Sequence, residues 1–215
     1  MPTPHLGIVV GLTAEARLAS GLGGVVETGG GDAPGATAAA TRLIQRGAGA
    51  LLSFGLAGGL SPTLAAGARV IPAAVVDMGG QTWPVDLDLA RRYGTATGTL
   101  LAADHVIATV EAKRAAWQAT GADAADLESG AVARVAAQHG LPFAVLRAVC
   151  DPAGRDLPPA ALTALDAQGR IQLFALIRAL TGNPGQIPAL IALGRDAALA
   201  RRTLLALVRA SRNIV

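Results

Sequence analysis

The sequence predicts an α/β fold, a three-layer sandwich in which helices cover both faces of a central mixed sheet. Short apolar runs alternate with helical segments from residue 6 to residue 149, and this alternation is typical of a covered parallel or mixed sheet. The chain has 215 residues, of which 52% are hydrophobic and 15% are charged, so it can bury a sizeable core. We therefore predict a single domain over residues 1–215 that ends in C-terminal helices.

The first strand and the first helix are expected at the N-terminus. Leu6–Val10 is a β-branched apolar run that ends at Gly11, which suits a buried strand. Thr13 is predicted to cap a helix whose first turn contains Glu15, an acid placed favourably against the helix dipole. Glu15 is thus either a helix-start residue or a functional carboxylate.

Two glycine-rich segments flank the second predicted strand. Gly29–Gly31 precedes a helix expected over 34–46, and its amides can approach an anion closely, although no complete phosphate-loop pattern is present. The second strand, 48–54, runs into Gly55–Pro62. We read this segment as a ligand-binding loop at the carboxyl edge of the sheet or as a tight turn.

The middle of the chain contributes two further predicted strands. Residues 67–77 read as a strand broken by a proline, and 79–98 as an irregular surface loop. The next strand, 99–107, contains His105, a lone histidine that reads as a structural or solvent contact rather than a catalyst. A helix is expected over 110–120.

Three acidic residues are expected to converge on one edge of the sheet. Asp126 is predicted to cap a helix over 127–139 and stands two residues before Glu128. The last buried strand, 142–149, delivers Asp151 at its end. Three carboxylates in an otherwise apolar chain indicate a functional site, although a helix cap explains Asp126 without any ligand.

The C-terminal third is predicted to form two helices, 160–180 and 187–211, divided by Gly182–Gly185. The stretch 184–215 contains five arginines and one acid, and it reads as an amphipathic basic helix. Two interpretations stay open. The helices pack on the sheet with solvated arginines, or they serve a membrane surface or a lipid substrate.

The composition argues against several functional classes. No run of about eighteen apolar residues indicates a membrane span, and the first residues lack a secretory signal, so we expect a cytoplasmic protein. The net charge is +3, but six aromatics and scattered basic residues argue against nucleic acid as a partner. Cys150 is the single cysteine and the three histidines show no ligand spacing, so we expect no internal disulfide and no metal.

An ordered set of short motifs covers roughly residues 6–155. In chain order these are Gly11-Leu12-Thr13-Ala14-Glu15, Thr28-Gly29-Gly30-Gly31, Gly55 to Leu64 with Gly67, Ala103 to Ile107, Asp126-Leu127-Glu128-Ser129 and Arg147 to Asp151. The set resembles the nucleoside phosphorylase and nucleosidase superfamily, in particular the branch with methylthioadenosine/S-adenosylhomocysteine nucleosidase. The length, Leu56 and the arginine-bearing C-terminal region look most like the hopanoid-associated phosphorylases.

The resemblance implies a nucleoside phosphorylase-like fold and cleavage of the N-ribosidic bond of an adenine nucleoside. It implies a catalytic role for three carboxylates. Asp151 would act at purine N7, as the general acid or as the residue that orders a proton there. Glu128 would accept hydrogen bonds from the ribose hydroxyls and stabilise the cationic sugar, and Glu15 would orient the attacking water.

The resemblance also implies a set of substrate-binding residues. The set is Leu127, Ile107, Val106, Asp126, Gly58 and Leu56. Leu127 would lie against the sugar, where relatives commonly have methionine. The backbone of Ile107 would recognise the edge of adenine, with Val106 near its face.

Water and phosphate stay alternative nucleophiles. At the position of Glu15, the bacterial hexameric phosphorylases have an arginine that binds phosphate. At the position of Leu56, many relatives have a residue with a hydroxyl group. Gly29, Gly31 and Arg17 could still form a phosphate or water site. We expect hydrolysis rather than phosphorolysis, with no cofactor and with phosphate as the alternative co-substrate.

The finer resemblance implies adenosylhopane as the substrate, a lipid-linked adenine nucleoside of hopanoid biosynthesis, with the C-terminal helix at the membrane surface. A soluble methylthioadenosine/S-adenosylhomocysteine nucleosidase is one alternative. A nucleoside-binding module without turnover is another. Relatives assemble as dimers to hexamers, so a homo-oligomer is expected.

Overall fold

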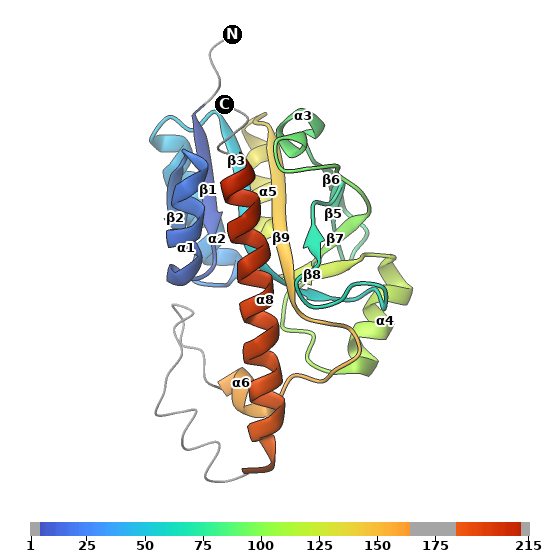
Figure 1. Ribbon diagram of the computed structural model, residues 1–215. Coiled ribbons are helices and arrows are strands. Elements are labelled where there is room, and N and C mark those ends of the chain that lie inside the picture. Colours follow the sequence, from blue (N-terminus) through green and yellow to red (C-terminus); the bar gives the residue numbers. More distant parts are fainter. Residues whose placement is uncertain (1–4, 164–183, 212–215) are drawn as a thin grey trace.

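The computed structural model describes residues 5–163 and 184–211 (Figure 1). Nine strands form one sheet. They are β1 (Leu6–Val10), β2 (Val25–Thr28), β3 (Ala50–Gly59), β4 (Arg69–Val70), β5 (Ala74–Asp77), β6 (Thr82–Pro84), β7 (Thr99–Ala102), β8 (Ala124–Asp126) and β9 (Phe143–Asp151). The α-helices are α1 (Thr13–Ala19), α2 (Ala33–Gln45), α3 (Leu87–Arg91), α4 (Val110–Thr120), α5 (Ser129–Gln138), α6 (Pro159–Thr163) and α8 (Ile187–Ser211).

The sheet is mixed, and β3 and β9 form its centre. The main path runs β2-β1-β3-β8-β7-β5-β6, and β9 pairs with β3 and β4. Strands β1, β2, β3 and β9 run parallel, whereas β3 pairs with β8 in the antiparallel sense. The predicted α/β fold with a mixed central sheet is therefore confirmed.

The helices cover the two faces of the sheet. Figure 1 shows α8 in front of β9 and α5 behind it. Helix α8 packs on β9 and α1, whereas α2 packs on α5. With both faces covered, β3 and β9 are buried along almost their whole length, which explains why they read as continuous apolar runs.

One prediction was wrong at the glycine segment after the second strand. Strand β3 does not end at Phe54 but continues through Gly59, paired with β9 and with β8. A Cβ at Gly55 would collide with the Arg147 guanidinium. The glycines therefore let the strand pass close to a buried charged side chain, and they do not form a loop.

A second irregularity lies at the same end of β3. Ala57 pairs with Val149, but Gly58 pairs with Asp151, so the register shifts by one residue at a β-bulge. Cys150 is the extra residue on β9. Bulges of this kind redirect the chain near functional sites.

Several predicted boundaries also differ. Thr13 is the first residue of α1 and not its cap, a position that Leu12 occupies. The segment 79–98 is not an irregular loop, because β6 and α3 form within it and Asp86 caps α3 through a 2.8 Å hydrogen bond from the Leu89 amide. Strand β7 ends at Ala102 and not at residue 107.

The predicted bounds of two helices agree with the structure. Helix α4 has the predicted bounds, and α8 covers the predicted range. Of the helix expected over 160–180, the structure describes only its start in α6, and the remainder lies outside the described residues. No helix in ranges 5–163 and 184–211 combines the length and apolarity needed to cross a membrane.

We predict that Gly130 is required where α5 packs on the end of β7. A Cβ at this position would collide with the Cβ of Ala102, so Gly130→Ala should lower the free energy of unfolding by about 1–3 kcal/mol. Gly194 in α8 is exposed and has no atom within 4 Å of such a Cβ. Gly194→Ala should instead raise stability by about 0.5–1 kcal/mol. Equal urea midpoints for the two variants would contradict this assignment.

Candidate active site

Three buried carboxylates surround one buried guanidinium midway along the central strands, beside the carboxyl end of β1. Glu15 comes from α1, Asp126 from the end of β8, and Glu128 from the residue before α5. Their exposed fractions are 3%, 8% and 5%, and Arg147 on β9 is 1% exposed. The carboxyl end of β1 lies beside the middle of β3, and the antiparallel strand β8 runs from the end of β3 back toward its middle, so elements distant in sequence meet here.

Arg147 holds this cluster together. Its Nη2 lies 2.5 Å from Asp126 Oδ2, 3.4 Å from Glu128 Oε2 and 2.7 Å from Ser53 Oγ. The sequence motif included Arg147, but no role was assigned to it. The available signal was a single charge in the middle of an apolar strand, which requires a buried counter-charge.

Glu15 is more than a helix-start acid. Its Oε2 accepts hydrogen bonds from the amides of Gly11 and Leu12, at 3.1 Å and 2.9 Å. Its Oε1 accepts a third bond, at 2.9 Å, from the amide of Leu56 on β3. Burial raises the pKa of Glu15, and the charge of Arg147 opposes that rise. The carboxyl is therefore fixed between α1 and the centre of the sheet.

Glu128 has an oxygen without a partner. Its carboxyl lies over Gly11, where a Cβ would come within 2.8 Å of Oε2. Its Oε1 is buried and has no hydrogen-bond partner among the described residues. Burial raises the pKa of Glu128 to about 7, Arg147 opposes the rise, and the neighbouring Asp126 and Glu15 add to it. A buried acceptor of this kind can receive a hydroxyl donor from a ligand.

Asp126 uses both of its oxygens within the protein. Oδ1 accepts a 3.0 Å hydrogen bond from the Ser129 amide at the start of α5. Oδ2 accepts a 2.5 Å bond from the Ser129 hydroxyl and pairs with Arg147. Asp126 is not the N-cap of α5 as predicted, because α5 begins two residues later and Glu128 occupies that position. The Asp126 side chain still accepts a hydrogen bond from the first amide of the helix, and it also pairs with Arg147.

Asp151 ends β9 and lies opposite Gly58 in the ladder. A Cβ at Gly58 would be 3.8 Å from Asp151 Oδ2, so Gly58 leaves room beside the carboxyl. The same oxygen pairs with Lys113 of α4, whose Nζ is 2.7 Å away. Burial raises the pKa of Asp151, and Lys113 opposes the rise.

A cavity of about 190 Å³ adjoins Asp151. Its lining comes from the segment after β9 and from α8, and consists of Asp151, Arg155, Asp156, Leu157, Pro158, Ala189, Ala192, Leu193 and Asp196. Arg155 and Asp196 form an ion pair across it. Glu128 does not line this cavity, so the cavity does not join Asp151 to the carboxylates around Arg147.

The remaining residues expected to bind substrate lie around this edge. Leu127 is half-buried beside Glu128, and Leu56 serves through its backbone, with its amide on Glu15 and its carbonyl 3.4 Å from Arg147 Nη1. Ile107 is half-buried between β7 and α4, and Val106 is 46% exposed.

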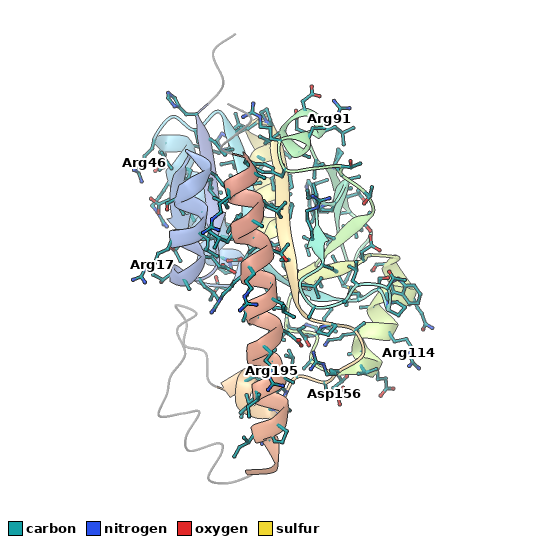
Figure 2. All side chains as sticks on the ribbon, in the orientation of Figure 1. Arg17, Arg46, Arg91, Arg114, Asp156 and Arg195 are labelled. Carbon is teal, nitrogen blue, oxygen red and sulfur yellow. The ribbon has the colours of Figure 1, made fainter. Side chains whose placement is uncertain are left out.

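The residues proposed for phosphate are not gathered at the carboxylates. The amides of Gly29 and Gly30 donate to the carbonyls of Val10 and Gly11, at 2.7 Å and 3.1 Å. Arg17 is exposed and extends away from the sheet (Figure 2). Two of the three glycine amides are thus already used by the backbone, and the predicted role of Gly31 stays untested.

The cation within the carboxylate cluster is a side chain of the protein. Among the described residues, no group of three histidine, cysteine, aspartate or glutamate side chains could hold a metal ion. The cation between Glu15, Asp126 and Glu128 is the guanidinium of Arg147.

Comparison with protein families gives a match over the middle of the chain. Residues 86–181 match the Phosphorylase superfamily. This range contains Asp126, Glu128, Arg147 and Asp151, four of the charged residues that form the site. No match was found among curated proteins.

Comparison with solved structures shows a similar fold over nearly the whole length of this chain. The S-adenosylhomocysteine nucleosidase of Streptococcus pyogenes, in complex with 5-methylthiotubercidin, is 15% identical with a TM-score of 0.68, covering 97% of each chain. The methylthioadenosine/S-adenosylhomocysteine nucleosidase of Colwellia psychrerythraea, in complex with adenine, is 18% identical with a TM-score of 0.69, covering 97% of this chain and 96% of that one. Futalosine hydrolase of Helicobacter pylori is 15% identical with a TM-score of 0.66, covering 96% and 97%.

We predict that Glu128 makes stability depend on pH. Its pKa is about 7 in the folded state against an ordinary value of 4.5, so the folded protein binds this proton more tightly than the unfolded chain. The free energy of unfolding should therefore fall as pH rises from about 4.5 to 7, by on the order of 3 kcal/mol from this residue.

Glu128→Gln should lose this dependence, so its stability relative to wild type should improve as pH rises through that window. Urea unfolding at several pH values measures the difference. Glu111→Gln, at an exposed position on α4, is the matched control and should parallel wild type. Parallel curves for Glu128→Gln as well would contradict the assignment.

Proposed function

We propose that this protein is a nucleosidase that cleaves the N-ribosidic bond of an adenine nucleoside and releases adenine. The observation that carries the proposal is the unpartnered, buried Oε1 of Glu128 within a cluster of catalytic-type carboxylates. It offers an acceptor for a sugar hydroxyl at the edge of the sheet where α/β folds bind ligands. The phosphorylase-superfamily match over residues 86–181 supports the same reaction class.

The chemistry requires separate groups for the sugar and the base. As the bond breaks, positive charge develops on the ribose and negative charge on the departing purine. Glu128 accepts the ribose hydroxyls, and its negative charge favours the cationic sugar. Asp151, at the end of β9, serves the purine at N7.

Water is the nucleophile in this proposal. Three backbone amides fix the Glu15 carboxyl, and its raised pKa suits a group that receives a proton from water. A phosphate site has less support, because the Gly29 and Gly30 amides bond to the backbone and Arg17 faces solvent. Two of the solved structures with a similar fold are a nucleosidase and a hydrolase, names that also imply water as the nucleophile.

For the substrate we propose a nucleoside with a large apolar substituent, such as adenosylhopane. The α8 wall of the cavity beside Asp151 contains Ala189, Ala192 and Leu193. Farther along α6 and α8 are exposed apolar side chains, namely Leu162, Ile187, Ile191 and Leu199, with exposed fractions of 44–50%. Each 100 Å² of lipid surface buried there would contribute about 2.5 kcal/mol, at about 25 cal/mol per Å².

We predict adenine release that does not need phosphate. Purified protein with methylthioadenosine or adenosylhopane should release adenine at equal rates with and without phosphate, as followed by chromatography. Asp151→Asn should lower the rate about 10²- to 10⁴-fold, while Asp104→Asn, at an exposed position, should leave it unchanged.

Strict phosphate dependence would eliminate water as the nucleophile. Adenine binding without release by the wild type would favour a binding module. Asp151→Asn with wild-type activity would remove Asp151 from the reaction.

We also predict selectivity for the lipid-linked nucleoside. Replacing both Ile187 and Ile191 by serine should raise KM for adenosylhopane about tenfold or more, since both side chains are exposed apolar surface. KM for methylthioadenosine should not change. Leu87→Ser, which alters an exposed leucine on α3, is the control. Efficient cleavage of methylthioadenosine by a protein that leaves adenosylhopane untouched would favour the soluble alternative.

A further inference from the structure

Lys113 is the only lysine in the chain, which has seventeen arginines. It lies on α4 and is 1% exposed, although the residues on either side, Ala112 and Arg114, are exposed. At this one buried position the chain has a lysine, although all its remaining lysine-or-arginine positions are arginine. A buried ammonium requires compensation by nearby charge and hydrogen bonds.

The ammonium of Lys113 has a complete set of acceptors. Its Nζ lies 2.7 Å from Asp151 Oδ2, 2.7 Å from the carbonyl of Arg155 and 3.2 Å from the carbonyl of Pro152. Three acceptors match the three N–H donors of an ammonium group. A planar guanidinium presents five donors in a fixed fork and would not fit the same three acceptors. Lys113 therefore fixes both the carboxyl of Asp151 and the segment that follows it.

Other charges face Asp151 from the neighbouring elements. Arg155 and Asp156 follow it in the chain and line the same cavity. Asp196 of α8 also lines the cavity, but it is paired with Arg155. Lys113 is the ammonium in direct contact with Asp151 and has the strongest opposing effect on the rise in the pKa of Asp151 that burial causes.

We propose that Lys113 is a positioning residue that holds Asp151 as a carboxylate, with Oδ2 on the ammonium and Oδ1 left for the purine. Within the described residues, Oδ1 has no hydrogen-bond partner of its own. The inference rests on the nucleosidase function proposed above. It assigns Asp151 the role of accepting a hydrogen bond from protonated N7, in place of donating a proton.

The reaction balances with this assignment. The bond between the sugar carbon and purine N9 breaks with its electron pair moving to the purine, while N7 takes a proton from solvent water and leaves a hydroxide ion. The oxygen of the attacking water forms the new bond to the sugar carbon and passes its proton to Glu15, which then gives it to the hydroxide and returns to the carboxylate. The products are neutral adenine and the free sugar, and the negative charge of Asp151 stabilises the protonated purine as it leaves.

The pH dependence of activity distinguishes the two roles of Asp151. Lys113→Met removes the cation, so the pKa of the buried carboxyl rises. If the carboxylate is the active form, the acid limb of the kcat/KM profile should move up by about one to three pH units. Activity should then recover at alkaline pH, where the carboxyl ionises again.

The matched control is Arg114→Met, which removes the same charge from the next residue on α4. Arg114 is exposed and points into solvent (Figure 2), so the profile should stay at the wild-type position. An unmoved acid limb in Lys113→Met would overturn the proposal. An acid limb at the wild-type position together with an alkaline limb that moves to higher pH would also overturn it, because Asp151 would then act in its protonated form.

A second measurement does not depend on activity. Because the chain has one lysine, labelling with ¹⁵N-lysine gives a single side-chain ammonium signal. This signal should persist at neutral pH, shift as Asp151 titrates, and lose that shift in Asp151→Asn. A signal that is insensitive to Asp151→Asn would overturn the pairing.

The two proposals can fail separately. If the wild type released no adenine from any adenine nucleoside, the nucleosidase function would fall, and the ammonium titration would still decide whether Lys113 keeps Asp151 ionised. If the wild type released adenine but neither Lys113→Met nor the titration behaved as described, only the role of Lys113 would fall.

Discussion

The site depends on a single buried guanidinium placed among three carboxylates. Without Arg147, the charges of Glu15, Asp126 and Glu128 would repel one another in a medium that solvates none of them. With it, the three acids come from α1, β8 and the start of α5 and still occupy one volume. The compensation is incomplete, since one cation faces three acids. Burial raises the pKa of Glu128 to about 7, the neighbouring Asp126 and Glu15 add to the rise, and one oxygen of this carboxyl has no partner among the described residues.

The sheet topology separates this cluster from Asp151 while keeping both on one edge. Arg147 and Asp151 lie four residues apart on β9, the strand that pairs with β3. Each is held by its own partners, Arg147 by the acids and Asp151 by Lys113. Two differently charged regions therefore lie along one strand, and the proposed function assigns the sugar to one and the purine to the other. A nucleoside has the same division into sugar and base.

Much of the fold could be predicted because its signals are local. Leu6–Val10 and α4 were predicted at their observed bounds. An apolar β-branched run predicts a strand, and a helical run between turn signals predicts a helix, without any information from distant residues. The end of β3 was predicted wrongly because glycine usually marks a turn. Here a glycine within the strand accommodates the Arg147 guanidinium. The catalytic roles of Glu15, Glu128 and Asp151 were predicted through the ordered motifs and stay predictions. Arg147 and Lys113 received no role because their partners are distant in sequence, and only the folded chain brings them together.

The bulge on β9 fixes the length of the strand at this point. Cys150 is the one residue that β3 does not match, because Ala57 faces Val149 and Gly58 faces Asp151. A deletion of Cys150 would restore an uninterrupted ladder and yet withdraw the Asp151 carboxyl from the Lys113 amine on α4. The contact between Asp151 and Lys113 therefore depends on the number of residues in β9 and not on the side chain at position 150.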